Sequence, residues 1–244
     1  MFGLRSRLPV SDEERQWVDR AFARLSALLG ESRMLEAEVI LPIPKHFPDP
    51  YDATEDTVGR LFLRICEYMG VDRGRIDLEV FPDSTTHLRE ILPFWQAKST
   101  GCAGLYTRTS DHSRMVVAVK GSQLNDPLAL VATLAHELGH VILLGGELVN
   151  RSAPDMEPFT DLLTVFLGLG VFTANTAARF EQHGGGGRQG WSIQRLGYLS
   201  EEMYGYALAR FGRERGEDRP EWEKYLSTNV KSFYKCSRSW LSSS

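Results

Sequence analysis

The feature that most constrains this chain is an apolar stretch, residues 128–144, that also carries two histidines and a glutamate. Asp126 and Pro127 precede it. Aspartate is a good N-cap, and proline suits the first helical position because its missing N–H needs no partner there. Gly145 and Gly146 follow and predict the end of the helix. Buried polar groups without partners are costly in free energy. If this helix is buried, its histidines and its glutamate therefore need partners from elsewhere.

The three polar residues form an HExxH motif, His136-Glu137-Leu138-Gly139-His140. The two histidines lie one helical turn apart, so both imidazoles project from the same face. Two neutral imidazoles so placed can bind one Zn²⁺ at about 2.0–2.1 Å. Glu137 lies about 100° around the helix, so it can reach a metal-bound water and act as its general base. The alternative interpretation is a helix whose histidines are hydrogen-bonded at the surface.

A catalytic zinc site needs a third protein ligand and one open position. The longer motif HExxHxxGxxH is excluded because Leu143 and Gly146 stand at its glycine and histidine positions. Glu157 and Asp161 share a face of the next predicted helix. Glu157 can therefore be the third ligand, and Asp161 can accept the distal N–H of a ligating histidine. Glu157 could instead be a first-turn acid favoured by the helix dipole. The rival ligands are Asp155, Glu147, His112 and His183.

HExxH followed by Glu157-x-x-x-Asp161 resembles the gluzincin metallopeptidases. The ExxxD form is similar to that of the membrane-bound gluzincins that process prenylated proteins and of their soluble relatives, and the HELGH context is similar to metallopeptidases that cleave phage-type repressors. The resemblance covers residues 126–175. It implies a zincin-like α+β fold, with a small mixed sheet and helices in the N-terminal part, a helical C-terminal part and a metal cleft between them. It also implies an edge strand antiparallel to bound peptide, for which residues 114–120 are the candidate; the alternative is that they form an ordinary strand within the sheet.

The function predicted from these residues is zinc-dependent peptide-bond hydrolysis, in which Glu137 activates the metal-bound water. The substrate would be a protein or a peptide. A further hydrogen-bond donor should stabilise the oxyanion, and the candidates are Tyr198, Tyr204, Tyr206 and His183. Two other classes stay open: a catalytically silent zinc-binding module that acts as a sensor or partner-binding domain, and a metal-free structural domain.

The rest of the chain predicts a single domain over residues 1–244, with a mixed part, 1–125, and a helical part, 126–244, that carries the metal motif. Apolar periodicity predicts further helices over 11–29, 52–70, 155–175, 200–212 and 220–241. Alternation and β-branched content predict strands over 35–41, 75–82, 104–108 and 114–120, the last two as a hairpin. The tract 181–190, with four consecutive glycines, is expected to be flexible.

Composition and charge argue against nucleic-acid binding, secretion and a membrane span. The chain has 28 basic and 32 acidic residues and a net charge of −4, which gives no general reason to bind nucleic acid. Its three cysteines form no CxxC pair, which favours a reducing compartment. No secretory signal is visible near the start, and the most apolar run, 162–174, is too short to span a bilayer. We therefore expect a cytoplasmic protein without a membrane span; the oligomeric state stays open.

Overall fold

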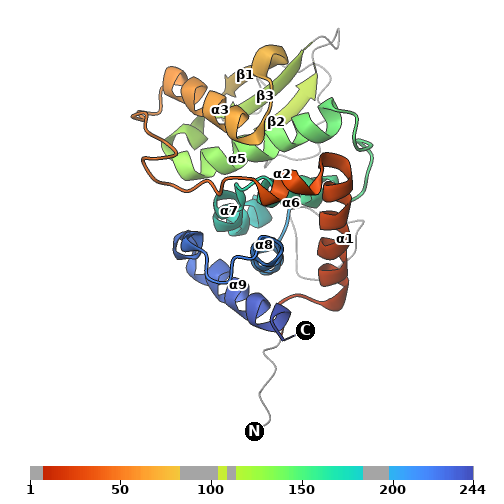
Figure 1. Ribbon diagram of the computed structural model, residues 1–244. Coiled ribbons are helices and arrows are strands. Elements are labelled where there is room, and N and C mark those ends of the chain that lie inside the picture. The colour runs from red at the N-terminus through yellow and green to blue at the C-terminus, as the bar shows by residue number, and fades with distance from the viewer. Residues whose placement is uncertain (1–7, 83–103, 109–113, 184–197, 244) are drawn as a thin grey trace.

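The computed structural model describes residues 8–82, 104–108, 114–183 and 198–243. It has the mixed α+β class that the sequence predicts, with helices predominating over a small sheet (Figure 1). The described helices are α1 (Asp12–Leu29), α2 (Glu31–Leu35), α3 (Glu55–Met69), α5 (Pro127–His140), α6 (Met156–Phe166), α7 (Gly170–His183), α8 (Glu201–Glu214) and α9 (Thr228–Leu241). The described strands are β1 (Ile76–Phe81), β2 (Gly104–Arg108) and β3 (Met115–Lys120).

The three described strands form a mixed sheet in the order β1-β3-β2. β2 pairs with β3 in the antiparallel sense, which confirms the predicted pairing of these two strands, and β1 pairs with β3 in parallel. The expectation that 114–120 is an edge strand is wrong, because β3 is hydrogen-bonded on both sides. Its four central residues are buried, as expected for a strand covered on both faces.

Helix α5 occupies the middle of the molecule. In Figure 1 the sheet, α3 and α5 form the upper part, and α6 to α9 lie below. α5 contacts β2, β3 and α3 on one side and α6 and α7 on the other. Every residue from Ala129 to His140 is buried. The histidines and the glutamate of the HExxH motif therefore lie inside the protein, where they need partners.

α5 and the π-helical turn that follows it, Val141–Gly145, together form an apolar stretch of 19 residues. Among the described helices, this one is long and apolar enough, by length and composition, to cross a membrane. Its mean hydropathy is 1.6, and 78% of its most apolar window is buried inside the protein. The central helix of a folded core has the same properties, so length and composition alone decide nothing about a membrane.

The N-terminal helix α1 packs with the C-terminal helices rather than with the sheet. Trp17 donates its indole N–H to Asp155 at 3.2 Å. Asp19 accepts hydrogen bonds from the Tyr206 hydroxyl at 2.9 Å and from Arg210 at 2.7 Å. In space, therefore, the helical part also includes the first helix of the chain.

Two predicted elements differ from the observed ones. Residues 36–40 form no strand: α2 ends at Leu35, and the Ile40 N–H donates to the Gly168 carbonyl at 2.9 Å. The predicted helix 155–175 is two helices, α6 and α7, because Gly168 has a φ of 86°. That conformation favours glycine and ends α6. The flexible tract predicted over 181–190 lies outside the described residues from 184 onward.

The remaining helices confirm the sequence prediction with small shifts. Ser11 caps α1 in a capping box with Glu14, and Gly70 ends α3 in the left-handed conformation. The last predicted helix, 220–241, is a 3₁₀ turn, Glu221–Tyr225, followed by α9. The hydrophobic core runs from α1 and α3 through α5 to α8 and α9.

Candidate metal centre

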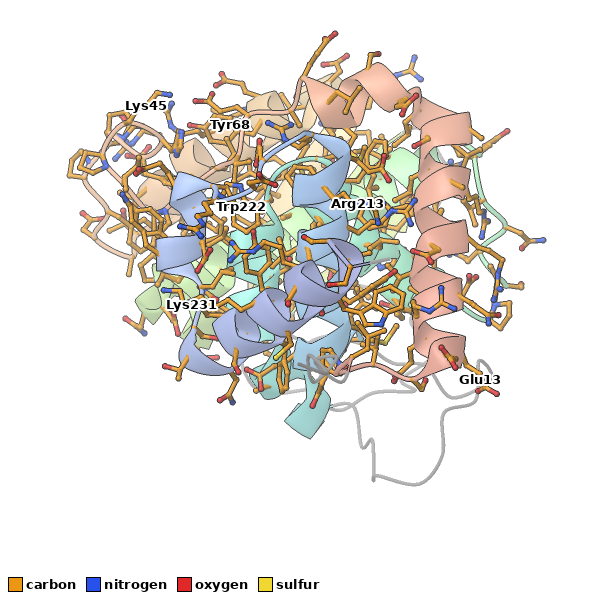
Figure 2. All side chains as sticks on the ribbon, turned by 60° about the horizontal axis from the view of Figure 1, so that its bottom comes forward. Glu13, Lys45, Tyr68, Arg213, Trp222 and Lys231 are labelled. Carbon is orange, nitrogen blue, oxygen red and sulfur yellow. The ribbon has the colours of Figure 1, made fainter. Side chains whose placement is uncertain are left out.

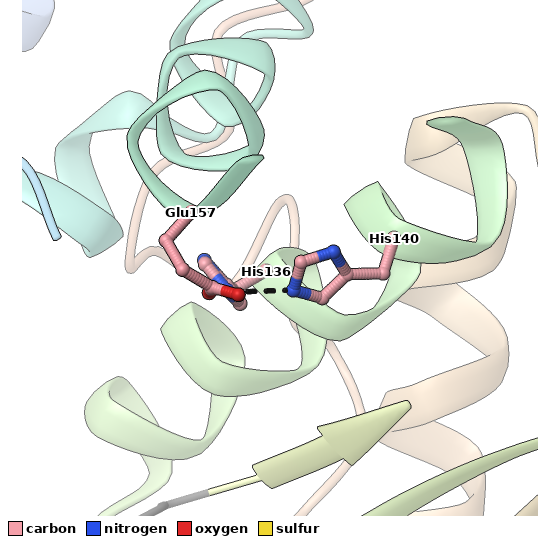
Figure 3. Close-up of side chains that lie close together, drawn as sticks. All are labelled: His136, His140 and Glu157. Carbon is pink, nitrogen blue, oxygen red and sulfur yellow. Dashed lines mark hydrogen bonds and ion pairs between the residues drawn. The ribbon is translucent and has the colours of Figure 1, made fainter. Parts of the chain in front are cut away.

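His136, His140 and Glu157 come together at the contact between α5 and α6 (Figure 3). One oxygen of Glu157, Oε2, lies 3.0 Å from Nε2 of His136 and 3.5 Å from Nε2 of His140. One ligand atom from each residue lies within 4.8 Å of those of the other two. The two imidazoles come from the C-terminal half of α5, and Glu157 comes from the first turn of α6. These are the three residues that the sequence predicts as ligands.

The arrangement fits a divalent metal ion. Ligand atoms at about 2.0–2.1 Å from a tetrahedral ion are about 3.3 Å apart, close to the two distances to Glu157. Two imidazoles and a carboxylate are ligands that zinc and several other divalent metals accept. The side chains of both histidines are less than a tenth exposed, whereas that of Glu157 is 43% exposed, so the cluster is open on the side of the carboxylate.

Both histidines are held by acceptors on the same helix, α6. Nδ1 of His136 lies 2.7 Å from Oδ1 of Asp161, as the sequence predicts. The other oxygen of Asp161 accepts the Leu199 N–H at 2.9 Å, so this carboxylate is fixed at both oxygens. Such contacts leave Nε2 of the imidazole free for a metal.

Thr160 holds the second histidine, a contact that the sequence pattern did not predict. Its Oγ1 lies 3.3 Å from Nδ1 of His140 and donates its own hydrogen to the Met156 carbonyl at 2.8 Å. Thr160 is three residues after Glu157, so helical spacing places it on the side of α6 that faces α5. That spacing was a usable signal, but threonine at a mid-helix position is common for other reasons.

The pKa values of His136 and Glu157 shift because of burial and because the two groups lie in close contact. Burial alone would lower the pKa of His136, but hydrogen bonds to Asp161 and Glu157 raise it well above its ordinary value. Burial would raise the pKa of Glu157, but hydrogen bonds from His136 and His140 lower it further than burial raises it. The two pKa values therefore shift in opposite directions for one reason, the close contact between the Glu157 carboxylate and the His136 imidazole.

Glu137 lies beside the cluster and not in it. It is 4% exposed, and burial raises the pKa of its carboxyl group. The backbone of β2 passes next to it: a Cβ on Gly104 would stand 2.7 Å from Oε1 of Glu137. A void of about 10 Å³ is lined by Glu137, His136 and Thr133 among others, and this is room for about one water. The buried Thr133 hydroxyl has no hydrogen-bond partner within the described part of the chain.

The predicted oxyanion donors lie at different distances from this cluster. The ring of Tyr198 is 5.2 Å from that of His136. Tyr204 is fully buried and lines the void together with Asp161. Burial, and after it the charge of Asp161, raise the pKa of Tyr204 well above its ordinary value. Tyr206 is bonded to Asp19, on α1.

The rival ligands do not join the cluster where they are described. Asp155 accepts the indole N–H of Trp17, and Glu147 is exposed with a φ of 55°. His112 lies outside the described residues. His183 ends α7, and its side chain also lies outside the described part.

Comparison with family models, with curated proteins and with solved structures found no match. The site is therefore interpreted from its own chemistry.

Proposed function

We propose that this protein is a zincin-like, gluzincin-type metallopeptidase that hydrolyses peptide bonds with one zinc ion. The observation that supports this most strongly is the buried cluster of His136, His140 and Glu157 with a second carboxylate, Glu137, next to it. Two imidazoles and one carboxylate leave the fourth position of a tetrahedral zinc open, as catalytic zinc requires and structural zinc does not. The void beside Glu137 accommodates about one water.

In this proposal each residue has a separate task. His136, His140 and Glu157 hold the ion, and Asp161 and Thr160 orient the two imidazoles. The ion supplies Lewis acidity and lowers the pKa of a nearby water to about 7.

Glu137 moves the proton. It takes one proton from the water whose oxygen attacks the peptide carbonyl carbon, and it returns that proton to the leaving nitrogen as the C–N bond breaks. Burial favours this role, because a raised pKa makes the carboxylate a better base than an exposed glutamate. Tyr198, whose ring lies 5.2 Å from that of His136, is the proposed donor to the oxyanion, and Tyr204, which lines the same void, is the second candidate.

The substrate is proposed to lie along β2. This strand, not β3, is the outer strand of the described sheet on the side of the motif, and Gly104 brings its backbone next to Glu137. The proposed substrate is a protein or a peptide.

The test compares the wild type with Glu137→Gln and with Glu147→Gln, a control at an exposed glutamate just after the motif. Each purified protein is analysed for zinc and incubated with an unfolded protein, carboxymethylated casein. We expect all three to bind one zinc ion and only Glu137→Gln to lose cleavage. Equal cleavage by wild type and Glu137→Gln would refute the proposal. Zinc binding without cleavage by any of them would support the silent module instead.

A further inference from the structure

A second pocket lies beside the N-terminal end of α5, the helix that carries His136 and His140. Its volume is about 290 Å³, at the small end of the range for ligand pockets. It is lined by the segment 42–51, by α3, by the start of α5 and by Phe172 of α7. None of its lining residues lines the void beside Glu137. It is therefore a site of its own, next to the helix that carries the histidines.

The walls of this pocket are fixed by hydrogen bonds before any ligand arrives. The buried His46 ring accepts the Leu41 N–H at 2.8 Å, and the Tyr68 hydroxyl donates to the His46 carbonyl at 2.5 Å. The Tyr51 hydroxyl donates to the Leu124 carbonyl at 2.8 Å. Figure 2 labels Lys45 and Tyr68 at this corner of the molecule. A pre-formed pocket binds without first having to order its loop.

Most of the lining is apolar. Its walls include proline rings, aliphatic side chains and aromatic rings: Pro42, Ile43, Pro44, Phe47, Leu61, Val131 and Phe172. Leu128, on the first turn of α5, also lines the pocket although it is 51% exposed. The body of a ligand here should therefore be hydrocarbon, because contact with it would remove this apolar surface from water.

The polar groups of the lining favour an acceptor at one end of the ligand. The hydroxyls of Tyr51 and Thr57 already have partners. Arg60 and Arg64 remain, and each guanidinium has five N–H donors. Arg64 donates to Asp49 at 2.7 Å and Arg60 to Asp56, in pairs whose carboxylates are 44% and 79% exposed. Exposed pairs of this kind contribute little free energy, so the guanidiniums can share their donors with an anion.

We infer that this pocket binds a small amphiphilic monocarboxylate, with a hydrocarbon chain against the apolar walls and the carboxylate at Arg60 and Arg64. Arg64 is paired with Asp49 of the lining and Arg60 with Asp56 just outside it, so the ligand's carboxylate would share guanidinium donors with these two pairs. Pro127, Leu128 and Val131 belong to α5, so a ligand in this pocket would contact the helix that carries His136.

The first experiment measures binding by calorimetry on the Glu137→Gln protein, so that its result does not depend on the peptidase activity. The probes are hexanoate, octanoate and the neutral octanol. We expect one saturable site, an affinity about fourfold higher for each added methylene, and at least about tenfold weaker binding of octanol. Absence of saturable binding, or equal affinity for octanoate and octanol, would refute the inference.

The second experiment changes the charge at the mouth. Leu128→Asp and Leu128→Lys alter an exposed position, so both variants should keep the fold, as circular dichroism can check. We expect the aspartate to weaken octanoate binding about tenfold relative to the lysine. Arg60→Gln with Arg64→Gln should remove the preference for octanoate over octanol, and Arg213→Gln, at a distant exposed arginine, should leave it unchanged. Equal octanoate affinity in all these variants would place the ligand elsewhere.

Discussion

The proposed metal site depends on one hydroxyl group, that of Thr160. Its oxygen contacts Nδ1 of His140 at 3.3 Å, and valine has nearly the same shape without that oxygen. We expect Thr160→Val to weaken zinc binding about 10–100-fold, the usual effect of losing such a partner, and Thr160→Ser to preserve it. Competition with a chelator of known affinity measures this. Equal affinities for the valine and serine variants would show that His140 needs no partner here.

Cys66 tests the packing of α3 independently of any activity. The residue is 2% exposed, and burial raises the pKa of its thiol to about 12. The thiolate is the reactive form, so at pH 8 the folded protein should leave Cys66 unmodified by iodoacetamide. Mass spectrometry of the Cys66 peptide should show alkylation only after unfolding in urea. The half-buried Cys236 serves as the internal comparison, and rapid alkylation of native Cys66 would contradict the observed burial.

At the scale of single residues, the sequence predicted which side chains come together, because their spacing carries the information. His136 and His140 are fixed relative to one another by helix geometry alone, and Glu157 and Asp161 by the same rule. Neither Thr160 nor the closeness of Gly104 to Glu137 could be predicted, because both depend on how two elements pack against each other.

Among the elements, α5 and α6 are held close by a glycine inside the motif. A Cβ on Gly139 would stand 2.7 Å from the methyl group of Thr160. Gly139→Ala should therefore displace α6, and with it both Glu157 and the partner of His140. We expect zinc affinity to fall about 10–100-fold, although alanine favours a helix over glycine by about 1 kcal/mol.

Gly59→Ala is the matched control, because nothing lies within 4 Å of a Cβ there. That variant should gain up to about 1 kcal/mol in unfolding free energy and keep its zinc affinity. If Gly139→Ala bound zinc as tightly as Gly59→Ala, the contact between the two helices would not set the position of Glu157.

Gly168 separates α6 from α7, and its conformation is strained for any other residue. Its φ is 86°, and an added Cβ would overlap the Glu38 carbonyl oxygen. Gly168→Ala should lower the unfolding free energy by at least about 3 kcal/mol, measured in urea. Gly216→Ala, at a φ of 69° with open space around it, should cost only about 1 kcal/mol. Similar losses would mean that backbone strain, and not the contact with Glu38, dominates at Gly168.

Element prediction failed where tertiary contacts override local pattern. Residues 35–41 alternate like a strand, but the chain there packs against Gly168 and finds no strand partner among the described residues. The helix predicted over 155–175 is continuous in hydrophobicity, but Gly168 interrupts it with a φ of 86° at its contact with Glu38.

At the scale of the whole molecule, the sequence predicted the fold class but not the arrangement. The parallel pairing of β1 with β3 places β3 at the centre and leaves β2 beside Glu137. Strand order depends on long-range pairing, which alternation within one strand does not encode. The packing of α1 against α6 and α8 joins distant parts of the sequence in the same way.

Zinc should stabilise the whole fold, because the ligands come from two helices that must be docked before they can bind it. A ligand present at 100 times its dissociation constant adds about 2.7 kcal/mol to the unfolding free energy. For a chain of this size that corresponds to a rise of roughly 5–11 °C in Tm. Differential scanning calorimetry with and without a chelator measures the shift, and no shift would indicate that the metal plays no part in the fold.

Two variants separate the ligand from its neighbour at the start of α6. Glu157→Ala removes a proposed ligand, so its Tm should hardly respond to zinc. Asp155→Ala removes instead the acceptor of the Trp17 indole, so it should lower Tm with and without metal while leaving the zinc-dependent rise intact. The reverse pattern would make Asp155 the third ligand. Because the two acids are only two residues apart, this comparison tests the geometry of the metal centre rather than the acidity of the helix terminus.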